Sequence, residues 1–220
     1  LEGGYFEAAP SDPSSLSEFL FPFEISQSEI TRAQWASLSG GAPPAASEAE
    51  LPMTFDDAES LESALSGAPS GASGVVAIPF QAEWELAAQG DRLQHHALYP
   101  WAESFPFGEG VSEEGVTDGL RCDRAISYEC GLGLDSPASS YFMRSPTSPL
   151  GQTPQGVSDL SGHAAEWVTD SDGYRLVGGS AAASSAFLRL SAWIEGDDPA
   201  IDAISAPGSR GVRLVTRGAP

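Results

Sequence analysis

The feature that most constrains this chain is the run of residues 156–170, GVSDLSGHAAEWVTD. It contains two glycines, three acidic residues and a tryptophan. It follows neither the 3.6-residue period of an amphipathic helix nor the alternation of a half-buried strand. Acidic residues and glycines suit a tight winding of the backbone, and Trp167 suits an anchor in the core. The run therefore predicts an irregular loop whose backbone winds tightly around a bound group or a core side chain, rather than a simple core helix or strand.

The composition of the 220-residue chain indicates a folded protein and excludes several classes of partner. Hydrophobic residues make up 41% and there are five tryptophans, which favours a packed core over disorder. The formal net charge of −21 argues against a nucleic-acid partner, which needs a cationic face, and against an anionic membrane surface. With no internal repeat and no clean linker, we expect one domain over residues 1–220 with a loosely structured arm at 1–18.

All ten basic residues are arginines, and the sequence has neither lysine nor asparagine. Coding bias and adaptation to high salt are the two explanations, and without asparagine there is no Asn-X-Ser/Thr glycosylation. No apolar run approaches the roughly 18 residues that a membrane-spanning helix needs, so we expect no membrane span. No signal peptide is visible, but the sequence starts at Leu1, which leaves export open.

Regular structure is expected in short pieces. Expected helices cover residues 31–38, 56–65 and 81–88, and expected strands cover 19–25, 174–177, 187–193 and 211–215. Thr31 and Gln34 have the spacing of a capping box at the start of the first helix. Residues 91–160 have little periodicity and much Gly, Pro and Ser, which is more irregular chain than a compact domain normally carries. A disulfide, a metal or a specialised fold is needed to hold them.

Several segments match the motifs of one known family in order: residues 29–35, 51–58, 78–88, 99–101, 156–170, 178–180 and 210–213. The segment IPFQAEWELAA at 78–88, for example, is close to the family pattern LPTEAEWEYAA. The chain thus resembles the formylglycine-generating enzyme (sulfatase-modifying factor) family along nearly its whole length. The resemblance implies an α+β domain with an atypical C-type-lectin-like fold, made of short helices, short antiparallel strands and much irregular loop.

The positions of the family's catalytic residues depart from the family pattern. In catalytic members, two cysteines after the Gly-Gly-Ser motif bind copper and oxidise a substrate cysteine. The resemblance places Ala183 and Leu188 at these positions, and neither side chain can ligate a soft metal or exchange disulfides. The tryptophan and asparagine of the family's N-V-W-E-W motif are Ala165 and His163, and the arginine before Gly-Gly-Ser is Val177. We therefore expect the family's active centre to be missing.

The resemblance also implies a calcium site in this region. The family holds calcium with the side chain at the Asp159 position, the backbone carbonyls at the Gly162 and Ala164 positions, and the glutamate at the Glu166 position. Calcium prefers six to eight hard oxygen ligands, and all four family ligands carry over. The alternative is that Asp159 and Glu166 cap turns or accept backbone hydrogen bonds.

The two cysteines, Cys122 and Cys130, have a spacing that recurs in a bacterial subgroup of the family, and we predict a disulfide between them. In the chain-entropy model such a short closed loop gains about 2–3 kcal/mol, and the bond implies an oxidising compartment. Two buried thiols or a redox pair are the alternatives. A second calcium site of the family corresponds to Asp123 and Asp135, for which solvated carboxylates are the alternative.

The remaining candidate groups suit structural roles. Other enzymatic relatives hold iron with a histidine triad from an additional helical domain, which this chain lacks. Its own histidines are His95, His96 and His163, and the adjacent pair suits an exposed position better than a metal site. Trp84, Trp101 and Trp167 are expected to anchor the core rather than to stack on a ligand, whereas Trp35 and Trp193 suit either role.

Together these observations predict a non-catalytic binding or structural module, stabilised by calcium and a disulfide, with a protein or carbohydrate partner. The expected location is secreted, periplasmic or on the cell surface. One alternative is a subunit of a larger extracellular or envelope assembly. Another is an enzyme that uses different chemistry in the family cleft, although the sequence order does not bring Ser184, Ser185 and His163 together as a nucleophile and base.

Overall fold

The computed structural model describes residues 5–6, 18–19, 23–67, 75–89, 99–100, 125, 151–153, 155–190, 192–195 and 209–217. Its helices are α1 (Arg32–Ser39), α2 (Ala58–Ser66), α3 (Gln81–Gln89) and the 3-10 helix η6 (Ser185–Leu188). Its strands are β1 (Tyr5–Phe6), β2 (Glu18–Phe19), β3 (Phe23–Ile25), β4 (Val75–Ala77), β5 (Ala165–Thr169), β6 (Tyr174–Val177), β7 (Trp193–Glu195), β8 (Arg210–Gly211) and β9 (Val215–Arg217). The predictions for Cys122, Cys130, Asp123, Asp135, His95, His96 and Trp101 lie outside the described residues.

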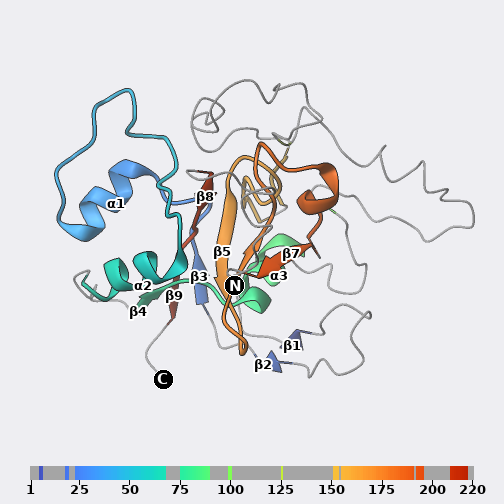
Figure 1. Cartoon of the computed structure of the whole chain (residues 1–220). Helices are drawn as coiled ribbons and strands as arrows, with labels where there is room; N and C mark the ends of the chain where they lie inside the picture. Colours follow the sequence, from blue (N-terminus) through green and yellow to red (C-terminus); the bar gives the residue numbers. More distant parts are fainter. Residues whose placement is uncertain are drawn as a thin grey trace, which may run out of the picture.

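The strands form three small sheets, which confirms the expected α+β class (Figure 1). The largest sheet has the order β7-β6-β5-β8, in which β5 pairs antiparallel with β6 and parallel with β8. A second sheet has the order β3-β9-β4 and a third consists of β1 and β2. Only residues 212–214 separate β8 from β9. This short connector therefore joins the two larger sheets.

The helices begin where their capping residues predict. Gln34 N donates to Thr31 Oγ1 at 3.2 Å, and Thr31 N donates to Gln34 Oε1 at 2.8 Å, which is the expected capping box. Gly40 ends α1 in the left-handed region at a φ of 69°, a conformation that glycine adopts without strain. Asp57 caps α2 by accepting from Ser60 N at 2.7 Å.

Two of the predicted strands are wrong in part. The region 187–193 contains the end of η6 and only the first residue of β7. Leu188, at the end of the 3-10 helix, and Leu190 are both buried. This alternation of buried residues is also the pattern of a strand, which is why the sequence predicted one. The region 211–215 is split because the connector 212–214 leaves the first sheet before β9 enters the second.

Strand β5 lies inside the run 156–170, for which no simple core element was expected. Its first four residues are all buried, because both faces of the strand are covered. Such a strand has no alternation of polar and apolar residues, which explains why its sequence shows no period. Only the first part of the run, residues 156–164, is irregular.

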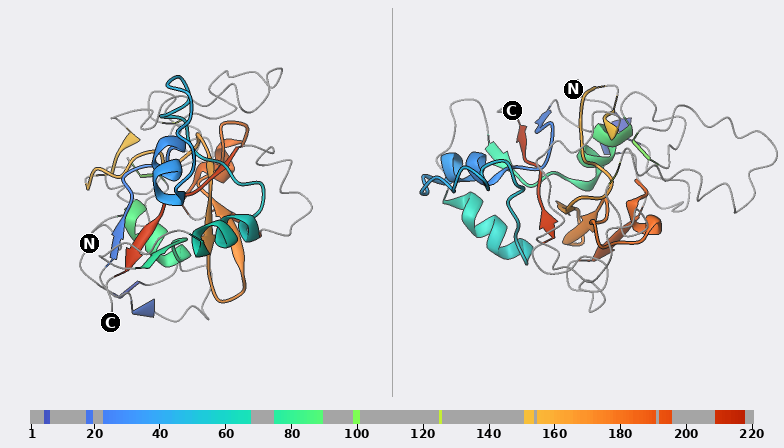
Figure 2. Two further views of the ribbon diagram at one scale, coloured as in Figure 1. Left: turned by 90° about the vertical axis from the view of Figure 1, so that its left-hand side faces the viewer. Right: turned by 90° about the horizontal axis from the view of Figure 1, so that it is seen from above.

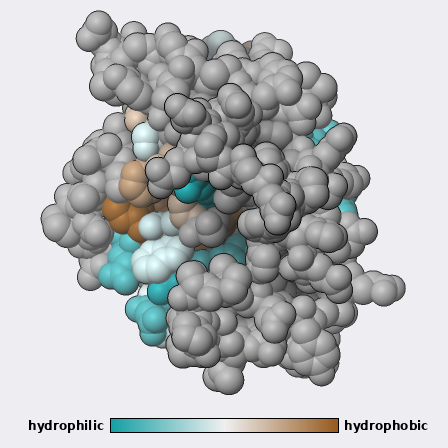
Figure 3. Space-filling view, turned by 90° about the vertical axis from the view of Figure 1, so that its right-hand side faces the viewer, coloured by the Kyte–Doolittle hydropathy of each residue, from teal (hydrophilic) through white to brown (hydrophobic). Residues whose placement is uncertain are grey.

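Trp35, Trp84 and Trp167 belong to hydrophobic clusters of the described core. Trp84 and Trp167 are fully buried, which confirms the core positions predicted for them. Trp35 packs edge-on against Phe55 with ring centroids 5.0 Å apart, and Trp193 is 42% exposed. Helices α1 and α2 lie together on one side of the molecule (Figures 1 and 2), and their apolar residues share a hydrophobic cluster with residues of β5 and β7. On the face seen in Figure 3, apolar and polar described residues adjoin one another.

Helix α3 buries two acidic residues together with its apolar ones. Glu83 accepts from Arg217 Nε at 2.7 Å and from Arg217 NH2 at 2.6 Å, so its charge is balanced. Glu85 accepts from Gln81 Nε2 at 2.7 Å. Burial raises the pKa of Glu85 to about 7, although the Gln81 hydrogen bond and the charge of Arg175 act in the opposite direction.

This raised pKa predicts that the protein loses stability between pH 4.5 and pH 7. The native state binds the Glu85 proton more tightly than the unfolded chain, so the stabilisation is complete below about pH 4.5 and is lost as pH rises through about 7. The difference is at most about 3 kcal/mol. Urea unfolding of the Glu85→Gln variant at several pH values should show a flatter pH profile and greater stability than the wild type at pH 8. Parallel profiles for the two proteins would contradict the assignment.

Candidate functional site

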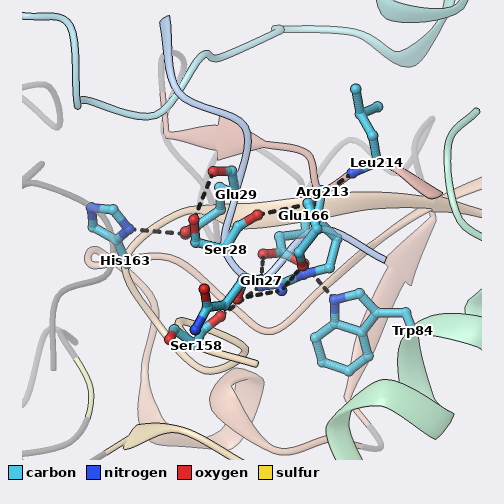
Figure 4. Close-up of polar contacts among 10 residues, drawn as sticks. Gln27, Ser28, Glu29, Trp84, Ser158, His163, Glu166, Arg213 and Leu214 are labelled. Atoms are coloured by element: carbon cyan, nitrogen blue, oxygen red, sulfur yellow. Dashed lines mark hydrogen bonds and ion pairs between the residues drawn. The ribbon is translucent and has the colours of Figure 1, made fainter. Parts of the chain in front are cut away.

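A buried ion pair occupies the centre of the molecule, between β5 and the connector that follows β8 (Figure 4). Arg213 NH2 donates to Glu166 Oε1 at 2.6 Å, and Arg213 Nε donates to Glu166 Oε2 at 2.7 Å. Trp84 Nε1, from α3, also donates to Glu166 Oε2. Both oxygens of the Glu166 carboxylate are therefore engaged by protein donors, and the pair has the bidentate geometry that makes arginine–carboxylate bonds strong.

The rest of the Arg213 guanidinium binds backbone carbonyls. NH2 donates to Ser158 O at 2.8 Å, and NH1 donates to Ser26 O at 3.1 Å and to Gln27 O at 3.4 Å. Ser158 N also donates to Gln27 O at 2.7 Å. Arg213 thus ties together the segment after β3, the irregular loop before β5 and β5 itself.

The electrostatics keep this pair charged. Burial lowers the pKa of Arg213, but the charge and hydrogen bonds of Glu166, with further attraction to Glu29 and Asp159, outweigh burial and raise it. Burial raises the pKa of Glu166 on balance, although Arg213 and the Trp84 hydrogen bond act in the opposite direction. We nevertheless assign a charged pair, because the guanidinium stays protonated at any ordinary pH and donates short bonds to both carboxylate oxygens.

A second buried cluster lies beside this pair and consists of Glu29, Asp159 and His163. His163 Nδ1 is 2.9 Å from Glu29 Oε1, and one ligand atom from each of the three residues lies within 4.8 Å of the other two. All three residues are buried. Burial raises the pKa of Glu29, but attraction to His163, its hydrogen bond and the charge of Arg213 outweigh burial, so the net pKa is lowered.

The four residues of the predicted calcium site lie on one continuous loop and strand. Asp159 and Glu166 are both buried. The Glu166 carboxylate accepts two hydrogen bonds from Arg213, whereas a carboxylate oxygen of Asp159 lies within 4.8 Å of ligand atoms of Glu29 and His163. A calcium ion on Glu166 would have to compete with a bidentate guanidinium. The donor set shown here therefore does not fit the predicted four-ligand site, and calcium at these residues stays a prediction.

The positions expected for copper-binding cysteines lie in an apolar cluster. Ala183 and Leu188 are 1% and 0% exposed, and pack with Tyr99, Ala125 and Phe187. Leu188 also lies against Gly179, where an added Cβ would meet Leu188 Cδ1 at 2.9 Å. An aliphatic surface of this kind offers no ligand atom to a soft metal.

A surface hollow of about 480 Å³ lies where the start of α2 meets β6 and β7. Its lining includes the carboxylates of Asp57, Glu59, Asp172 and Glu195, together with Trp167, Tyr174 and Arg175. Arg175 pairs with Asp170 at 2.5 Å and lies over the Trp193 ring, 4.0 Å from its centroid. The hollow is therefore acidic, with its one lining arginine already held by neighbours.

Sequence reasoning singled out Asp159, His163 and Glu166 but missed their partners. Glu29 and Arg213 both stand inside segments that matched family motifs, and this was the available signal. A charged residue embedded between apolar ones predicts a buried partner, but not which partner. The lining of the hollow comes from segments 57–59, 172–175 and 195, and no sequence pattern connects these.

These observations define a protein of mixed α+β fold in which irregular loops surround a buried polar centre. The family model described as "Sulfatase-modifying factor enzyme 1-like domain" matches residues 1–217, and the chain belongs to this family. Its fold is the C-type-lectin-like fold of formylglycine-generating enzymes, as the motifs implied. The comparison with curated proteins found no significant match to the sequence.

Three solved structures are similar to this chain in fold. PvdO from Pseudomonas aeruginosa matches with a TM-score of 0.61 at 16% identity, covering 99% of this chain and 92% of that one. Treponema denticola variable protein 1 matches with a TM-score of 0.56 at 16% identity, with coverages of 99% and 92%. CarF matches with a TM-score of 0.53 at 16% identity, with coverages of 99% and 97%. Within the described chain, no helix is long and apolar enough to cross a membrane.

The buried pair predicts a large effect of removing one partner. Arg213→Met leaves the Glu166 carboxylate buried without its cation and should lower the free energy of unfolding by about 3–5 kcal/mol. Adding Glu166→Gln should recover part of this loss, because no buried charge is then left unpaired. Urea unfolding of the single and double variants measures both effects.

The matched control is Arg32→Met, because Arg32 makes a more exposed ion pair with Glu48 at 3.0 Å. Its loss should change stability by less than about 1 kcal/mol. Equal effects of the Arg32 and Arg213 variants would contradict the central role of the buried pair.

Proposed function

We propose that this protein is a non-catalytic binding module of the sulfatase-modifying factor family that recognises a positively charged partner protein. The observation that carries the first part is the apolar packing of Ala183 and Leu188. Cysteine oxidation by the family needs soft, redox-active ligands at these positions, and neither side chain supplies one. The scaffold is thus retained while the residues for that chemistry are replaced.

The acidic hollow supports the second part of the proposal. Four carboxylates converge on it from α2, the β5–β6 turn and β7. The net charge of −21 adds a long-range field that attracts cations and basic surfaces. A lysine or arginine side chain of a partner fits such a hollow, because its charge meets carboxylates and its stem can lie along the Tyr174 ring.

A carbohydrate partner is less well supported at this hollow. Sugars are commonly held by exposed aromatic faces, but Trp167 is 1% exposed. The Trp193 ring, although 42% exposed, has the Arg175 guanidinium over one face. Tyr174 is then the half-buried ring of the lining on which a sugar could stack, beside four acidic residues.

The proposal is tested by the binding of a short fluorescent peptide of alternating arginine and glycine, measured by anisotropy at physiological salt. The double variant Asp172→Asn/Glu195→Gln removes two carboxylates from the hollow and should weaken binding roughly tenfold. The control Glu24→Gln/Glu48→Gln removes two exposed carboxylates that do not line the hollow, so it changes the net charge equally. Its affinity should stay within about twofold of the wild type.

Four results would count against the proposal or one of its parts. Equal weakening by both double variants would show non-specific attraction, and a neutral oligosaccharide that binds where the peptide does not would favour a carbohydrate ligand. Copper- and oxygen-dependent loss of the cysteine in a cysteine-containing peptide would contradict the non-catalytic assignment. A stable assembly of several copies in solution would favour the alternative role of a structural subunit.

We also propose that the module is exported and holds a disulfide between Cys122 and Cys130. The short spacing of the only two cysteines supports this bond, which would persist in an oxidising compartment. Mass spectrometry of native protein alkylated without reductant should show no labelled cysteine, and labelling of both after reduction. Two alkylated thiols in the unreduced protein would refute the bond and remove this support for export.

A further inference from the structure

We propose that Glu29, Asp159 and His163 form a buried site for one divalent first-row transition-metal ion such as Zn²⁺. The site uses two carboxylates and one imidazole. It is separate from the acidic hollow, whose lining contains none of these three residues, and it does not depend on the binding function proposed above.

The spacing of the three groups suits one coordination sphere. Their ligand atoms all lie within 4.8 Å of one another, and His163 Nδ1 is 2.9 Å from Glu29 Oε1. Two ligands that are each about 2.0–2.1 Å from an ion lie roughly 2.9–3.4 Å apart for bond angles between octahedral and tetrahedral values. A small movement of these side chains would therefore place an ion between them.

The three residues come from distant parts of the chain and converge in the interior. Glu29 follows β3, whereas Asp159 and His163 lie in the loop before β5. Glu29 is 0%, His163 1% and Asp159 7% exposed. Figure 4 shows His163 directed at Glu29, on the side away from Trp84. Exposed acidic clusters are common on a protein of this charge, but a buried carboxylate pair with an imidazole requires compensation of its charge.

Glu29 and His163 form an ion pair at 2.9 Å when the imidazole carries two protons. A divalent ion would replace the extra proton, because a metal-bound imidazole is neutral and presents a nitrogen lone pair to the metal.

The choice of donors favours a transition metal over calcium. Calcium prefers six to eight oxygen ligands, whereas an imidazole nitrogen suits Zn²⁺, Fe²⁺, Co²⁺ and Ni²⁺. The Glu166 carboxylate, which the four-ligand calcium site would need, is held by Arg213. The nitrogen ligand that separates the two kinds of ion is His163, whose ring lies with the carboxylates of Glu29 and Asp159.

The backbone around the ligands is fixed before any ion binds. Ile30 N donates to Val212 O at 2.8 Å, Ala181 N donates to His163 O at 3.0 Å, and Gly162 N donates to Gly178 O at 2.8 Å. These bonds anchor the residue after Glu29 to the connector after β8, and the backbone at residues 162–163 to residues 178–181. A site built on such a frame does not have to order a loop when it binds its ion.

The test starts from full-length protein stripped with a chelator and dialysed. Calorimetric titration with Zn²⁺ should give one ion per chain, bound roughly 100-fold or more tightly than Ca²⁺. The thermal midpoint should rise by roughly 5 °C or more with saturating Zn²⁺. Titration with Co²⁺ should produce visible d–d absorption that excess Zn²⁺ removes.

The variant His163→Gln can still hydrogen-bond to Glu29 but supplies no imidazole, so it should lose the Co²⁺ absorption and the preference for Zn²⁺. The control Glu24→Gln removes an exposed carboxylate from β3 and should bind like the wild type. If His163→Gln does not fold, the wild-type Co²⁺ protein still decides the question. A metal-bound histidine gives a strongly shifted imidazole N–H signal in its proton NMR spectrum, and the lack of that signal would overturn the proposal.

Other outcomes also overturn it. Ca²⁺ bound as tightly as Zn²⁺ with no effect of His163→Gln would assign the ion to the predicted four-ligand calcium site. The absence of stoichiometric binding by any of these ions would show that the cluster is a buried hydrogen-bonded group without a metal. Neither result would affect the peptide-binding test, because that test measures different residues.

Discussion

The bidentate contact between Arg213 and Glu166 is the interaction on which the rest of the structure depends. It holds residues 212–214, which follow β8, against β5. The same guanidinium donates to the backbone carbonyls of Ser26, which follows β3, and of Ser158, in the loop before β5. Such a group is expensive to remove from water, and only a complete set of partners offsets the loss of solvation. The irregular loop before β5 is therefore ordered by side-chain bonds rather than by a backbone ladder.

The buried charges also explain how a chain with a net charge of −21 packs a core. In the described part of the chain, Glu83 and Glu166 each meet an arginine, and Glu29 meets His163. Arginine can satisfy several acceptors from one planar group, which suits these interior positions. Other carboxylates lie at exposed positions, some of them around the acidic hollow, where they are available to partners.

The sequence motifs predicted the family, the α+β class and the three helices, because capping residues and motif order are local signals. Residues 187–193 and β5 were misjudged, since a 3-10 turn imitated a strand and a strand buried on both faces shows no alternation. The pairing of Glu29 with His163 and of Glu166 with Arg213 was not predictable. These contacts join residues 134 and 47 positions apart, and no local pattern encodes such distances.

The position of β9 has a consequence for how the protein is made. It is the last described strand along the chain, yet it lies between β3 and β4 and completes their sheet. During synthesis, β3 and β4 leave the ribosome long before the strand that must pair with both of them. Their edges stay open until then, and long-range pairing of this kind is slow and prone to aggregation. The nascent chain therefore cannot complete this sheet step by step, and protection of the early strands, for instance by a chaperone, would favour its correct folding.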